Sequence, residues 1–63
     1  MQEYEVVFLK RAVPAIPFAP GTRGAVVFVH RSIPPAYEVE FVDEAGKTLG
    51  VYTVEESDLE VAC

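Results

Sequence analysis

The sequence offers little material for covalent or metal cross-linking, because it contains one cysteine, Cys63, and one histidine, His30. A single cysteine cannot form a disulfide within its own chain. A zinc site needs three or four ligands at workable spacing, which His30, Cys63 and the carboxylates do not supply. We therefore expect no metal and no cofactor, and we place His30 at the surface or at a strand end.

Long apolar runs are also missing, which bears on membrane association. The longest runs, VVFL at residues 6–9 and GAVVFV at residues 24–29, are far shorter than the ~20 apolar residues that span a bilayer. The first residues, MQEYEVVFLKR, lack the apolar core of a secretory signal. We expect a cytoplasmic protein without a membrane segment.

Basic residues are few, with five Lys and Arg against ten Asp and Glu, so the formal net charge is −5. Residues 1–34 hold four bases and two acids, whereas residues 35–63 hold one base, Lys47, and eight acids. Nucleic-acid binding draws mainly on Lys and Arg, so this balance argues against a nucleic-acid partner. Arg11, Arg23 and Arg31 are weak candidates for contacts with an anion.

Periodicity predicts short strands and no sustained helix. Residues 36–42, AYEVEFV, are the clearest strand, because apolar and acidic residues alternate and only one face can be core. Residues 4–10 are predicted to be covered on both faces, with Tyr4, Val6 and Phe8 sharing one of them. The remaining predicted elements are a strand in AVVFVH at residues 25–30, a DEAG turn at 43–46 with positive φ at Gly46, a returning strand at 47–54, a turn or 3₁₀ element near 55–57 and a short last strand that carries Leu59 and Val61 inward.

Residues 11–22, RAVPAIPFAPGT, contain three prolines, which exclude a helix and a central strand. We interpret them as a long loop after the first strand that folds back and covers one side of the sheet with Phe18 or Ile16. Together the elements predict an all-β fold, a closed or half-open barrel of about five antiparallel strands. We expect residues 1–63 to form one domain.

The stretch PGTRGAVVFVH, residues 20–30, combines two glycines with an arginine. A phosphate-binding loop would lead into a helix N-terminus, whereas these glycines lead into a strand. We therefore predict that Gly21 is a turn residue with positive φ, and that Gly24 lets the strand start tightly packed or bulged.

The residues that could act in catalysis are not part of any sequence motif that would activate them. Neither serine lies in a nucleophile elbow, and we expect a domain of this size to have no cleft of ~300 Å³ or more. The paired acids on the 36–42 strand look solvated. We predict that the protein is not an enzyme, after weighing Ser32, Ser57, His30, Asp43, Asp58, Glu38 and Glu40.

The apolar excess of residues 25–30 is the more informative feature, because a small barrel hides only one face of a strand. If Val27 and Val29 point inward, Phe28 points outward. Phe28, Tyr52 and Val26 are the candidate interface, since they would form an exposed apolar patch. The alternative is that the proline-containing loop at residues 11–22 covers them.

PGTRGAVVFVH, YEVEFVDEAGKT at residues 37–48 and the closing Thr53, Val54, Asp58 and Leu59 resemble an uncharacterised family of short, stand-alone bacterial domains of unknown function. The resemblance implies an SH3-like β-barrel and brings no catalytic residues. GTRGAVVFV is also similar to the KOW motif, which implies a module that binds nucleic acid or protein. GTRGAVVFVH with AYEVEF is similar to the barrel domain of nitrile hydratase β subunits, which implies an accessory subunit or activator of such an enzyme.

Taken together, these features predict a small non-catalytic protein-interaction or accessory module. It would self-associate, for example as a dimer, or bind one protein partner. The alternatives are a KOW-like module that binds nucleic acid and an accessory protein of a nitrile-hydratase-like enzyme.

Overall fold

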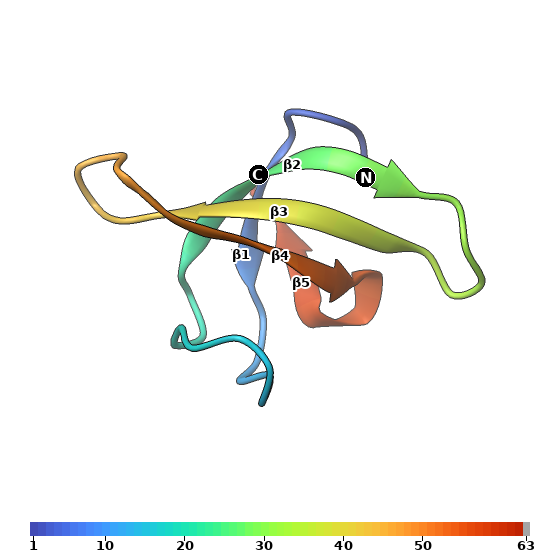
Figure 1. Cartoon of the computed structure of the whole chain (residues 1–63), viewed down its shortest axis with the longest axis horizontal. Coiled ribbons are helices and arrows are strands. Elements are labelled where there is room, and N and C mark those ends of the chain that lie inside the picture. Colours follow the sequence, from blue (N-terminus) through green and yellow to red (C-terminus); the bar gives the residue numbers. More distant parts are fainter. Residues whose placement is uncertain (63) are drawn as a thin grey trace.

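Five short strands pair into one antiparallel sheet in the computed structural model of the chain, which describes residues 1–62 (Figure 1). A single 3₁₀ turn, η1 (Glu56–Asp58), interrupts them. Cys63, for which no disulfide within the chain is expected, lies outside the described residues. The strands are β1 (Val6–Leu9), β2 (Arg23–His30), β3 (Ala36–Val42), β4 (Thr48–Glu55) and β5 (Leu59–Val61).

The strand order is β4-β3-β2-β1-β5, so the first four strands form a meander and the last strand returns to the first. The sheet is strongly curved, since β1 and β5 run steeply across the direction of β3 and β4 in Figure 1. The prediction of an all-β chain with about five antiparallel strands is confirmed. The sheet is open, with β4 and β5 at its two edges. Within residues 1–62, no helix has the length and apolar character needed to cross a membrane.

β3 has the predicted bounds, whereas β1 is shorter than predicted. Tyr4 has a φ of +68°, and the amide of Glu5 donates to the carbonyl of Gln2 at 3.2 Å. The chain therefore turns before Val6, and Tyr4 is exposed instead of sharing a face with Val6 and Phe8. The prediction that β1 is covered on both faces is also wrong, because Val6 is 43% exposed.

One face of the sheet forms the core. Every buried side chain among residues 1–62 is hydrophobic, which is what a domain with so little interior needs. Leu59 is buried as predicted, but Val61 is partly exposed on the edge strand β5. The buried residues are Val7, Leu9, Ile16, Val26, Tyr37, Val39, Phe41, Val54 and Leu59.

The segment between β1 and β2 supplies part of this core. Ile16 is 5% exposed, and Phe18 packs on the same face. The ring centroid of Phe18 lies 5.3 Å from that of Phe41 and 5.4 Å from that of Tyr52. The segment therefore covers the concave side of β3 and β4 with apolar groups.

A β-bulge in β2 changes which residues face the core. The register with β3 shifts between Val26 and Phe28, so Val27 is an extra residue that breaks the alternation of faces. Val26 is completely buried, whereas Phe28 is 53% exposed. The inclusion of Val26 in an exposed patch is therefore wrong. Strict alternation would have placed both residues on one face.

The two glycines of PGTRG have the predicted structural roles. Gly21 has a φ of +92°, which a turn tolerates best at glycine. Gly24 pairs with Val7 in β1 and Phe41 in β3. A Cβ atom at this position would lie 2.6 Å from Cγ1 of Val39 and 3.0 Å from the carbonyl oxygen of Glu40. Only glycine allows β2 to approach β3 this closely.

Candidate interaction surface

The convex face of the sheet carries most of the polar and exposed apolar side chains of the strands. Paired residues on neighbouring strands point to the same face, so the register defines rows that run across the sheet. One row is Val6, Ala25, Glu40 and Val51, and the next is Phe28, Glu38 and Thr53. These two rows place apolar and acidic side chains side by side.

Phe28 is the largest exposed apolar group in these rows. Its ring makes an edge-on contact with the imidazole of His30, with centroids 5.0 Å apart. Val51 is 52% exposed, comparable to Phe28 at 53%. Phe18, from the segment between β1 and β2, packs on the opposite face. Within residues 1–62 the proline-containing segment therefore covers the concave face and leaves Phe28 in contact with solvent.

Tyr52 does not lie beside Phe28. It pairs with the buried Val39 and is half-buried on the concave face, where its ring meets Phe18 edge-on. The structure thus corrects the predicted patch, because Phe28 faces one side of the sheet while Val26 and Tyr52 face the other. In the two rows of the convex face, the other large apolar residues that are exposed are Val6 and Val51.

A hydrogen-bonded group of three side chains adjoins Phe28. Oε2 of Glu38 lies 2.7 Å from Nε2 of His30, and the hydroxyl of Thr53 donates to the same oxygen. The hydrogen bond from Thr53, followed by the one from His30, lowers the pKa of Glu38 below its ordinary value although partial burial opposes this. Glu38 is therefore a fixed negative charge at neutral pH, and it holds the imidazole of His30 beside the ring of Phe28.

The serine, histidine and aspartate side chains weighed as a catalytic group are not brought together by the hydrogen bonds of residues 1–62. The hydroxyl of Ser32 donates to the carbonyl of Pro34 at 2.8 Å and is not hydrogen-bonded to His30. The acidic partner of His30 is Glu38, and neither Asp43 nor Asp58 takes that place. Glu38 and Glu40 are only partly exposed, and each accepts a hydrogen bond from a threonine. Among residues 1–62, no three His, Cys, Asp or Glu side chains are grouped to hold a metal ion.

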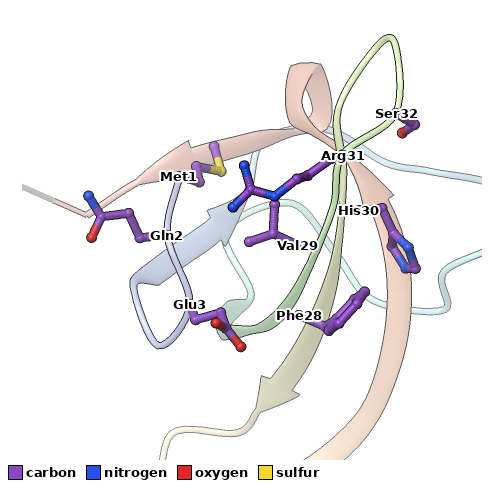
Figure 2. A pocket seen from close by; sticks show the side chains of 8 residues that line it. All are labelled: Met1, Gln2, Glu3, Phe28, Val29, His30, Arg31 and Ser32. Carbon is purple, nitrogen blue, oxygen red and sulfur yellow. The ribbon is translucent and has the colours of Figure 1, made fainter.

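An open groove of about 850 Å³ lies between the N-terminal residues and the end of β2. Val29 and Arg31 point toward Met1 and the N-terminal segment, whereas Phe28 and His30 point away from it (Figure 2). A second open groove, of about 610 Å³, lies at the other end of β2. The expectation that no depression of ~300 Å³ or more exists is therefore wrong, because the bent sheet and its terminal segments leave hollows at both ends of β2.

The three candidate arginines are not gathered into one basic site. Nε of Arg11 lies 3.4 Å from Oδ1 of Asp58, and its Nη2 donates to the carbonyl of Ser57. Arg23 lines the second groove together with acidic residues, and Arg31 lines the first. Arg23 is the first residue of β2 and Arg31 follows its last residue, so eight residues at ~3.3 Å each place them up to about 26 Å apart.

Comparison with known proteins identifies the family. A family described as "Domain of unknown function (DUF4926)" matches residues 3–61. The chain belongs to this family. The DUF4926 match covers all five strands and both rows of the convex face. No curated protein and no solved structure gives a significant match.

Proposed function

We propose that this DUF4926 domain is a small, non-catalytic protein-interaction or accessory module, which binds one protein partner or a further copy through its convex face. The observation that carries the proposal is the exposure of Phe28 in the row next to the one that holds the exposed Val6 and Val51. Large aromatic side chains at the centre of an apolar patch are common anchors of protein interfaces. In this chain Phe28 is held at the surface by a rigid sheet, so little ordering is needed on binding.

The apolar area that a partner would cover fits a modest protein interface. A phenylalanine buries ~150–250 Å² when it is fully covered, and 53% of Phe28 is still exposed. Covering that part removes roughly 100 Å² of apolar surface, which is worth about 2.5 kcal/mol. Val6 and Val51 add smaller contributions. A patch of this size suits a weak or transient partner rather than an obligate one.

The charges around Phe28 indicate the chemistry of the partner. Glu38 and Glu40 lie in the two rows that contain Phe28 and Val51. Their carboxylates favour a partner with Lys or Arg around an apolar centre, because complementary charge speeds encounter and suppresses wrong partners. We accordingly expect binding to weaken as the salt concentration rises.

We also propose that the sheet is an SH3-like barrel that has not closed. The support is the return of the last strand to the first, with a 3₁₀ turn before it, in a strongly bent sheet of five strands. Domains of that architecture carry many functions on their outer surfaces and loops, so the fold alone does not choose a partner.

The test compares Phe28→Ser with Ile33→Ser. Ile33 is fully exposed in the connection between β2 and β3, so its substitution matches the loss of apolar surface at another place. We expect Phe28→Ser to weaken association at least tenfold, in pull-down and in sedimentation, while Ile33→Ser leaves it unchanged. If Phe28→Ser binds every partner with the affinity of the wild type, the proposed surface is wrong.

A further inference from the structure

The one histidine of the chain, His30, lies on the convex face beside Phe28. The two residues are separated by one position in β2, so their side chains leave the same face of the strand. Both point away from the N-terminal segment in Figure 2, and their rings are 5.0 Å apart. Histidine is the side chain whose charge ordinarily changes between pH 5 and pH 8. The proposed interaction surface therefore contains a group that can respond to pH.

The hydrogen bond to Glu38 fixes which nitrogen of the neutral His30 ring carries the proton. Glu38 is ionised at neutral pH, because hydrogen bonds from Thr53 and His30 lower its pKa. An ionised carboxylate only accepts hydrogen bonds, so Nε2 of His30, 2.7 Å away, is the donor. Within residues 1–62 the other nitrogen, Nδ1, makes no hydrogen bond, and 41% of the side chain is exposed. A further proton is therefore added at Nδ1 from solvent, and the bond to Glu38 is kept.

The charged groups around His30 are mostly acidic. His30 pairs with Ala36, which pairs with Glu55, so Glu55 belongs to the same row but lies two strands away. Arg31 points the other way, toward the N-terminal segment (Figure 2). The charged groups of the elements packed around His30 are Glu38 and Glu40 of β3, Glu55 of β4, Glu3 and the α-amino group of Met1 before β1, and Arg31 after β2. Of these, Glu38 is the group bonded to the imidazole.

We propose that His30 makes the charge of the convex face depend on pH, so that a basic partner bound beside Phe28 at neutral pH is released as the pH falls. This inference rests on the proposed function, because it concerns the regulation of the same surface. The two rows that contain Phe28 carry two negative charges, those of Glu38 and Glu40. Protonated His30 forms an ion pair with Glu38 and leaves one of these charges uncompensated. The Lys and Arg side chains of a partner keep their charge throughout this range.

The effect on binding is graded, because the apolar contact with Phe28 is the same at both pH values. Exposed ion pairs each contribute little, and complementary charge acts mainly on the rate of encounter and on specificity. We expect binding at pH 5.5 to be about two- to fivefold weaker than at pH 8. The fold is expected to stay unchanged, since protonation at Nδ1 breaks no hydrogen bond.

Charged nitroxides measure the charge of the surface without any partner. A cationic and an anionic nitroxide each broaden the NMR signals of nearby protons, and the ratio of the two effects reports the local potential. At the ring protons of Phe28 we expect the cationic-to-anionic ratio to fall between pH 8 and pH 5.5. His30→Gln keeps a donor for Glu38 and every other titrating group, and its ratio should stay nearly constant. His30→Arg, which is positive throughout, should give a low ratio at both pH values.

A synthetic peptide with one leucine between two pairs of lysines tests the release of a basic partner. The peptide is titrated into the protein, and the NMR shifts of Phe28 and its neighbours give the dissociation constant. For the wild type this constant should be about two- to fivefold higher at pH 5.5 than at pH 8. For His30→Gln the constants at the two pH values should agree. Phe28→Ser should weaken peptide binding at both pH values.

Two results would overturn this inference alone. The first is a wild type that binds the peptide equally at pH 8 and pH 5.5. The second is a His30→Gln protein whose nitroxide ratio or peptide affinity changes with pH as much as that of the wild type. In both cases weaker peptide binding by Phe28→Ser would still support the proposed function. A wild type that binds the peptide at neither pH contradicts the proposed partner chemistry, and this inference with it.

Discussion

Replacing Gly24 by alanine probes the closest approach between two strands in the sheet. A Cβ atom at Gly24 would lie 2.6 Å from Cγ1 of Val39, 3.0 Å from the carbonyl oxygen of Glu40 and 3.2 Å from Cδ1 of Phe41. Carbon atoms pack best at ~3.5–4.0 Å. Val39 and Phe41 are completely buried, and the Glu40 oxygen belongs to the backbone, so none of these atoms can move without disturbing the core.

The expected loss of stability follows from these contacts. Adding a methyl group to a well-packed core costs about 1–3 kcal/mol. The reduced freedom of the unfolded chain on replacing glycine by alanine returns about 0.4–1 kcal/mol. The net effect is a loss of about 1–2 kcal/mol, a large share of the ~3–5 kcal/mol that a core of this size supplies. The melting temperature should fall by roughly 5–15 °C.

Urea unfolding followed by far-ultraviolet circular dichroism measures this loss. Gly50→Ala is the matched comparison, because its Cβ would approach Cε1 of Tyr52 at 2.9 Å and that half-buried ring can shift. We expect Gly24→Ala to be the less stable of the two variants. In a Val39→Ala background, the added penalty of Gly24→Ala should shrink, since Cγ1 is then absent. A Gly24→Ala protein within about 0.5 kcal/mol of the wild type would refute the reasoning.

Two further predictions concern the hydrogen-bonded side chains. Burial of the Tyr37 hydroxyl is the main cause that raises its pKa, and the hydrogen bond to Glu56 adds to it. The raised pKa stabilises the folded state at every pH below the ordinary tyrosine pKa. This stabilisation is lost as the pH rises through the raised pKa. Tyr37→Phe should cost about 1 kcal/mol at neutral pH and lose less further stability above about pH 10 than the wild type. The lowered pKa of Glu38 stabilises the fold above the ordinary carboxyl pKa, and this gain is lost as pH falls through the lowered value. Thr53→Val removes the main cause of the lowered pKa of Glu38. In acid-unfolding titrations, this variant should lose less stability than the wild type between neutral pH and about pH 3. An equal loss of stability in the variant and the wild type would contradict the prediction.

The strands could be predicted to a large extent, because strand period and turn residues are local properties. Residues 36–42 alternate so regularly that both bounds of β3 were predictable, and Gly46 has the positive φ expected of its turn, +85°. The local sequence pattern gave a wrong prediction at Tyr4, because this aromatic residue was expected in the first strand and has a positive φ instead. Its amide donates to the carbonyl of Val26, a contact with a residue far along the chain.

The surface was only partly predictable. The exposure of Phe28 followed from the excess of apolar residues in β2. The sequence did not predict which residues lie near Phe28 on the convex face, because these neighbours depend on the register between four strands. The bulge at Val27 turned Val26 into the core while Phe28 stayed exposed as predicted. A run of valines contains no signal for the residue at which the register shifts. The pairing of His30 with Glu38 likewise needed the β2–β3 register.

The sequence alone was enough to predict the all-β class, the number of strands and the structural roles of Gly21 and Gly24. These follow from side-chain period, backbone freedom and residue inventory, which are properties of short segments. The folded sheet was needed to show which face the proline-containing segment covers, that Phe28 lies among acidic residues on the convex face and that β4 is an open edge. Each of these depends on which strands become neighbours and in what register. Such contacts join residues far apart in the chain, so their energies appear only when the whole sheet has formed.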